Sequence, residues 1–98
     1  MELKHMLQDG ALTVAPAGRL DSATSDSFSE YILSLFTEDI KTLIIDFSEI
    51  DFISSKGLRV LVALYKQLNG RKMVLTGANS SVMEIFRISG FLKVFDIQ

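Results

Sequence analysis

Residues 42–59, TLIIDFSEIDFISSKGLR, decide the fold, because this stretch runs from a strand through a short connection into a helix. The nearly continuous apolar run over residues 42–47 is typical of a central strand covered on both faces. Residues 48–52 are expected to be a connection. Apolar residues then recur at helical spacing from residue 55 to 68. The predicted core stripe of this helix comprises Leu58, Leu61, Val62, Tyr65 and Leu68.

The segments before this stretch predict a hairpin and a first helix. Strands are expected over residues 2–7 and 11–17, joined at Asp9-Gly10, a pair that favours a tight turn. Pro16 has no N–H to donate, so it should lie at a sheet edge or near a strand end. A helix over residues 22–36 should begin under a cap from Asp21 or Ser22 and bury the apolar side chains Phe28, Ile32, Leu35 and Phe36.

The segments after residue 70 predict a strand, a third helix and a last strand. Residues 72–76 are expected to form a buried strand. Ser81 and Glu84 have the spacing of a capping box, which predicts the start of a helix that runs to Ser89. Residues 91–97 are expected to form the last strand.

The resulting element order is β-β-α-β-α-β-α-β. Strand–helix–strand units require parallel neighbours with right-handed crossovers, and the opening hairpin adds an antiparallel pair. The sequence therefore predicts a single domain, residues 1–98, of the α/β class. We expect a mixed β-sheet of about four to five strands with helices packed on it.

Composition and single residues argue against several kinds of function. The net charge of −2 disfavours nucleic-acid binding, and the lack of cysteine excludes thiolate chemistry. His5 is the only histidine, and Asp46, Glu49 and Asp51 flank a strand end, where acidic residues commonly solvate a turn. There is no phosphate-binding loop motif, no apolar run long enough to cross a bilayer and no signal-peptide core. We therefore expect a cytoplasmic protein that is not an enzyme and needs no metal or cofactor.

The turn Ser54-Ser55-Lys56-Gly57 is the most informative candidate site. One serine can cap the helix, which leaves the second hydroxyl to be presented outward. Gly57 weakens the first helical turn, which suggests close approach of another backbone or of a partner. The N-terminus of a helix stabilises a phosphate, while a partner with an acidic or apolar surface at the same place would be repelled. This combination describes a binding switch without an active site.

Two stretches make the chain similar to the STAS domain family, shared by anti-sigma factor antagonists and sulphate transporter tails. The first, Gly18-Arg-Leu-Asp-Ser-Ala23, is similar to the family's G-x-L-D-x-x segment. The second begins LIIDFSEIDFISSKGL at Leu43 and resembles the family's D-[LF]-S-x-[VI]-x-[FY]-[IM]-D-S-[SA]-G-L. The order of elements fits along nearly the whole chain.

The resemblance implies a partner and a modification. Stand-alone members bind an anti-sigma factor that is also a serine kinase of the histidine-kinase-like ATPase type, and a serine phosphatase reverses its action. By alignment the phosphorylated serine is Ser55, and Asp21 matches a position at the partner surface. The expected partner-binding residues are Asp21, Ser54, Ser55, Lys56, Gly57 and Arg59.

Two departures from the family pattern leave alternatives open. Ser54 stands where the family has aspartate, so Ser54 is an alternative phosphorylation site. Lys56 replaces a small residue and can pair with a phosphate or with an acidic partner. The alternative function is that of a constitutive interaction domain in a regulatory or transport complex, which is never phosphorylated.

Overall fold

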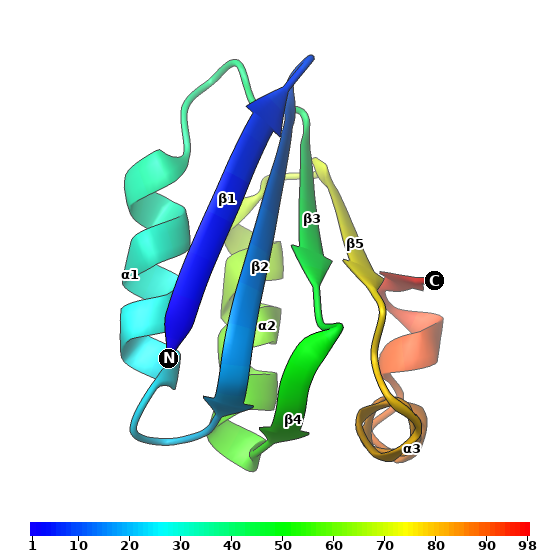
Figure 1. Cartoon of the computed structure of the whole chain (residues 1–98). Coiled ribbons are helices and arrows are strands. Elements are labelled where there is room, and N and C mark those ends of the chain that lie inside the picture. Colours follow the sequence, from blue (N-terminus) through cyan, green and yellow to red (C-terminus); the bar gives the residue numbers. More distant parts are fainter.

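A computed structural model describes all 98 residues as one mixed sheet with helices packed on it (Figure 1). The strands are β1 (Glu2–Gln8), β2 (Ala11–Leu20), β3 (Thr42–Asp46), β4 (Glu49–Ile53), β5 (Lys72–Thr76) and β6 (Asp96–Ile97). The helices are α1 (Ser25–Leu35), α2 (Ser55–Gln67) and α3 (Ser80–Ile88), followed by a 3-10 turn, η1 (Phe91–Lys93).

The sheet confirms the predicted fold class. Its strand order is β1-β2-β3-β5-β6, with β1 and β2 antiparallel and the other pairs parallel. The sheet has six strands, because β4 also pairs with β2, in parallel. Figure 1 shows α1 and α2 on the same side of the sheet. Right-handed crossovers that all step in one direction across a sheet place their helices on one face.

The central strand β2 changes partners halfway along its length. Its first half, Ala11–Val14, pairs with β3, and its second half, Ala17–Leu20, pairs with β4. The expectation of a plain connection over residues 48–52 was therefore wrong, because the end of β2 offers that segment a partner. Pro16 lies inside the sheet and not at its edge, and it falls in the break between the two pairings, where no ladder hydrogen bond to β3 or β4 is lost.

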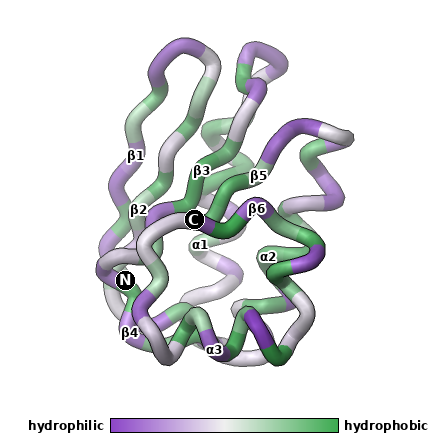
Figure 2. The backbone as a smooth tube through the Cα atoms, turned by 90° about the vertical axis from the view of Figure 1, so that its right-hand side faces the viewer, coloured by the Kyte–Doolittle hydropathy of each residue, from purple (hydrophilic) through white to green (hydrophobic).

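Strand β3 is central, as predicted, but it is covered fully on one face only. Leu43 and Ile45 are buried on the helix side, whereas Thr42, Ile44 and Asp46 on the other face are half-buried. A buried cluster of 20 residues joins the helix side of the sheet to all three helices. In Figure 2, β3 and β5 are largely hydrophobic, while the turns at the end of the sheet away from α3 are hydrophilic.

Helix α2 is rotated relative to its predicted core stripe. The buried residues are Gly57, Leu61, Leu64 and Leu68, whereas Leu58 and Val62 are half-buried and Tyr65 is 40% exposed. Gly57 faces the end of β2 at very short range, and this contact selects the buried face of the helix. The first helix buries Phe28 and Ile32 as predicted, with Leu35 and Phe36 only half-buried.

The start of α3 differs from the predicted capping box. Asn79 is the N-cap, and its Oδ1 accepts a hydrogen bond of 2.8 Å from the Val82 N–H. The Asn79 Nδ2 also donates to the Ile50 carbonyl oxygen at 3.2 Å, which ties the helix to β4. Ser81 lies within the helix, and Glu84 pairs with Arg87 instead of reaching back to the cap. An asparagine can make both bonds, because its amide both accepts and donates.

The expected last strand is mostly a turn. Phe91–Lys93 form η1, and only Asp96–Ile97 pair with β5. The Phe95 N–H donates to the Phe91 carbonyl oxygen at 2.9 Å, and the two rings lie 4.8 Å apart. In a strand, residues four apart would be separated by about 13 Å. The contact between these two buried rings therefore favours the turn.

Candidate functional site

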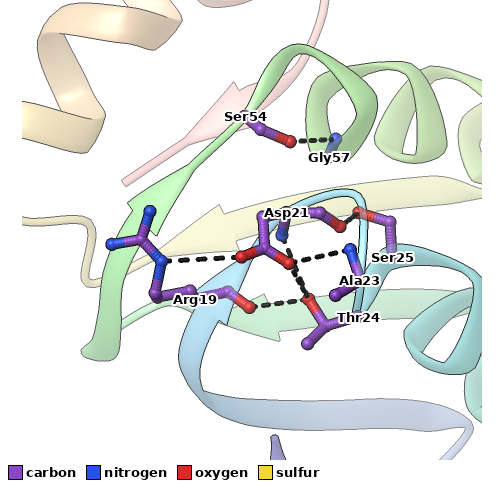
Figure 3. Close-up of polar contacts among 7 residues, drawn as sticks. All are labelled: Arg19, Asp21, Ala23, Thr24, Ser25, Ser54 and Gly57. Carbon is purple, nitrogen blue, oxygen red and sulfur yellow. Dashed lines mark hydrogen bonds and ion pairs between the residues drawn. The ribbon is translucent and has the colours of Figure 1, made fainter.

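The candidate site forms where the ends of β2 and β4 bring two loops together (Figure 3). Leu20 is paired with Ile53 in the parallel ladder, and the Ser54 N–H donates to the Leu20 carbonyl oxygen at 2.9 Å. The residue before Asp21 is thus bonded to the residue before Ser55. Two segments that are distant in the sequence are placed side by side by the backbone alone.

The two adjacent serines have different positions. The Ser54 Oγ accepts a hydrogen bond of 3.2 Å from the Gly57 N–H, so Ser54 is the N-cap of α2. Ser55, the first residue of the helix, is exposed, and its hydroxyl makes no hydrogen bond within the protein. The prediction that one serine caps and the other points outward is confirmed, and the outward one is Ser55. No base contacts its hydroxyl, so nothing in the structure would activate it as a nucleophile.

Gly57 allows the helix to approach the end of β2. A Cβ at this position would lie 2.6 Å from the Leu20 carbonyl oxygen and 2.8 Å from the Ile53 Cγ1. Of the two explanations suggested by the sequence, the structure therefore shows close approach of another backbone. Gly57 was expected to be among the partner-binding residues, but it is buried. It can support partner binding only by holding the start of α2 in place.

The two basic residues of the predicted site are in different environments. The Lys56 Nζ lies 3.1 Å from Asp26 Oδ2 of α1, an ion pair that joins the two helix starts. Arg59 is exposed and forms no ion pair. Lys56 is thus already partnered, while the guanidinium of Arg59 is available.

Asp21 organises its own loop rather than capping a helix. Its Oδ1 accepts a bond of 3.0 Å from the Ala23 N–H, and its Oδ2 lies 3.5 Å from the Arg19 Nε. The Ala23 backbone bond, with further hydrogen bonds from Thr24 and Arg19, holds the pKa of Asp21 below its usual value. The carboxylate is therefore charged at neutral pH. The prediction that Asp21 or Ser22 caps the first helix was wrong, because α1 begins at Ser25 after a Thr24 cap position without a side-chain bond.

Sequence reasoning missed three contributors to this site. Thr24 Oγ1 donates to the Arg19 carbonyl oxygen at 2.7 Å and closes the β2–α1 loop. The Arg19 guanidinium lies over the Phe52 ring, 4.4 Å from its centroid. Phe52 is 36% exposed, whereas the neighbouring Ile53 is buried. Asp26 is an acidic residue in a first helical turn, which is common. No local signal couples it to Lys56, 30 residues away.

The acidic residues and the histidine outside this site are dispersed over the fold. No group of three or more His, Cys, Asp or Glu side chains is placed to hold a metal ion. His5 is exposed in β1, and its Nδ1 is hydrogen-bonded to the Tyr31 hydroxyl at 2.6 Å. None of the helices has the length and apolar character to cross a membrane.

Comparison with known proteins identifies the family. Residues 5–98 match the STAS domain family, so the chain belongs to it. It is 32% identical over 91 residues to the putative anti-sigma factor antagonist BtrV of Bordetella bronchiseptica, covering 91% of this chain and 78% of BtrV.

Solved structures share this fold along nearly the whole chain. A putative anti-sigma factor antagonist from Thermotoga maritima superimposes with a TM-score of 0.90 at 17% identity, covering 97% of this chain and 84% of the other. SpoIIAA of Bacillus in its phosphorylated form gives 0.74 at 17% identity, covering 99% and 91%. SpoIIAA is itself described as an anti-sigma factor antagonist.

Proposed function

We propose that this protein is an anti-sigma factor antagonist that a serine kinase switches off by phosphorylating Ser55. One observation carries the proposal: an exposed, unbonded serine hydroxyl opens α2 beside the charged Asp21 loop, in a STAS domain whose relatives are named anti-sigma factor antagonists. The partner would be an anti-sigma factor that is also the kinase, and a serine phosphatase would reverse the modification. Such a system would operate in the cytoplasm.

The switch would act at the interface and leave the fold intact. A phosphate on Ser55 adds a charge of about −2 at a helix N-terminus, where the free N–H groups and the helix dipole favour it. The Ser54 cap and the Gly57 contact do not involve the Ser55 hydroxyl, so both would persist. Like-charge contact with an acidic partner surface would cost several kcal/mol, about a hundredfold or more in affinity.

Phosphorylation can be tested with purified kinases of the histidine-kinase-like ATPase type from the source organism. Incubation with ATP should add one phosphate, measured by intact mass, and Ser55→Ala should remove it. Ser54→Ala is the matched control and should remain a substrate, because the Ser54 hydroxyl is occupied as the cap. A phosphate that persists in Ser55→Ala and disappears in Ser54→Ala would move the site to Ser54.

Binding separates the switch from the alternative. Ser55→Asp should weaken binding of the anti-sigma factor about a hundredfold while the circular dichroism spectrum stays that of the wild type. Unchanged affinity would contradict the switch and favour a constitutive interaction domain. The departures from the family pattern at Ser54 and Lys56 favour this second function. The Lys56 ammonium already pairs with Asp26, so it is not free to pair with a phosphate.

A further inference from the structure

Arg59 lies one helical turn after Ser55, on the same side of α2. Residues four apart on a helix are neighbours, with their Cβ atoms about 5–6 Å from each other. Helical side chains also lean toward the N-terminus of their helix, over the turn that precedes them. The long Arg59 side chain can therefore reach the space in front of the exposed Ser55 hydroxyl.

The other cation at the start of α2 is engaged elsewhere. The Lys56 Nζ lies 3.1 Å from Asp26 Oδ2 of α1, and residues adjacent on a helix do not face each other. Helix α2 contains no acidic residue, so no carboxylate of its own competes for the Arg59 guanidinium. Of the two cations, Arg59 is the one placed to meet a negative charge on Ser55.

A phosphate on Ser55 has the chemistry that a guanidinium recognises. The kinase would transfer the γ-phosphoryl group of ATP to the Ser55 Oγ and release ADP and the hydroxyl proton. The product carries a charge of about −2 and three acceptor oxygens, two of which a planar guanidinium can bind at once. An anion at position i with a cation at position i+4 is also the favourable order of charges along a helix.

The spacing distinguishes the two adjacent serines. Four residues after Ser54 stands Leu58, which is apolar and half-buried, so a phosphate on Ser54 would have no basic partner one turn away. The Ser54 Oγ also accepts the hydrogen bond from the Gly57 N–H, whereas the Ser55 hydroxyl is unbonded. Only a phosphate on Ser55 meets a guanidinium.

We propose that Arg59 binds the phosphate of phosphorylated Ser55 within the same helix. This inference rests on the proposed function, which supplies the phosphate, and it deepens that function. Phosphorylation then changes the partner surface in two ways, because it adds negative charge and also engages the cation that the unmodified surface offers to a partner.

The test uses the full chain with phosphoserine incorporated at position 55 during synthesis, so no kinase is needed. Phosphorus NMR follows the second ionisation of the phosphate as the pH is changed. Its pKa should be about 0.5 higher in Arg59→Gln than in the protein that retains Arg59, because a neighbouring cation favours the dianion. Arg59→Lys should recover part of this difference, since it keeps the charge and loses the planar fork.

Lys66→Gln is the matched control. It removes the same charge from the same helix, about 16 Å along the axis from position 55, where salt screens the interaction at physiological ionic strength. The pKa of the phosphate should stay as it is with Lys66 in place.

Each outcome decides the inference. Equal pKa values of the phosphate in Arg59→Gln and Lys66→Gln overturn it, and so does a rise in Lys56→Gln without one in Arg59→Gln, which would mean that Lys56 leaves Asp26 for the phosphate. Binding of the anti-sigma factor tests the proposed function separately. If phosphoserine at position 55 weakens binding about a hundredfold and Arg59→Gln leaves the pKa unchanged, the proposed function stands and the inference fails. If Arg59→Gln raises the pKa and phosphoserine leaves binding unchanged, the inference stands and the proposed switch fails.

Discussion

Gly57 shows how a residue without a side chain controls the shape of the proposed binding surface. The 2.6 Å distance from its Cβ position to the Leu20 carbonyl oxygen leaves no room for a methyl group, and the obstacle is backbone on one side. Any larger residue must push the start of α2 away from the end of β2. Ser55 and Arg59 would then move relative to Asp21, although neither side chain has changed.

Gly57→Ala should therefore destabilise the protein by about 1–3 kcal/mol, the usual effect of overpacking, despite the better helix propensity of alanine. Urea unfolding followed by circular dichroism measures the change. Ser55→Ala is the matched control two residues earlier and should stay within about 0.5 kcal/mol, because its hydroxyl is exposed and unbonded. A Gly57→Ala variant as stable as the wild type would mean that the helix can shift at no cost.

The carboxyl group of Asp21 should titrate below the usual aspartate pKa of about 3.9. The backbone N–H of Ala23 is the main cause, and hydrogen bonds from Thr24 and Arg19 add to it. Because the folded pKa lies below the unfolded one, the stabilisation is complete above pH 4 or so and is lost as the pH falls through the folded value.

Carboxyl chemical shifts in an NMR titration measure the Asp21 pKa directly. Thr24→Val removes one hydroxyl donor and should raise the pKa part of the way, since the Ala23 N–H remains. Titration of wild-type Asp21 at the ordinary value would show that the loop bonds are not formed in solution.

At the scale of elements, Asn79 tests how α3 is fixed to the sheet. The side chain caps α3 at Val82 and also donates to the Ile50 carbonyl oxygen of β4. Asn79→Ser should keep the cap and lose the second bond, at about 1 kcal/mol. Asn79→Ala should lose both, at about 2 kcal/mol. An Asn79→Ser variant as stable as the wild type in urea unfolding would show that the bond to β4 contributes nothing.

The sequence predicts those elements whose signals are local. Helical periodicity located α1, α2 and α3 to within a few residues, and the paired serines predicted both a cap and an exposed hydroxyl. Strand β4 was missed because its only partner is the far half of β2, and the length of that strand is not visible in residues 48–53 themselves. The Lys56–Asp26 pair and the Phe91–Phe95 contact likewise depend on how distant segments fold back on one another.

At the scale of the whole molecule, the 20 buried core residues form one cluster without subdivision. Unfolding should therefore be a single cooperative transition. The two tyrosines report on different helices, Tyr31 in α1 and Tyr65 in α2. Their fluorescence should follow the same urea curve as far-ultraviolet circular dichroism. Separate midpoints, with Tyr65→Phe used to isolate the Tyr31 signal, would show that one helix detaches before the rest.

The pairing of Leu20 with Ile53 has a consequence for how recognition can evolve. The loops after β2 and β4 are joined through the backbone, so neither can drift in position without displacing the other. The two loops should therefore determine partner specificity together. In chimaeras with a relative, transplanting residues 18–24 and 49–59 jointly should transfer the choice of anti-sigma factor. A chimaera that carries only one of the two segments should combine loops that do not fit each other, and it should bind neither parent's anti-sigma factor well.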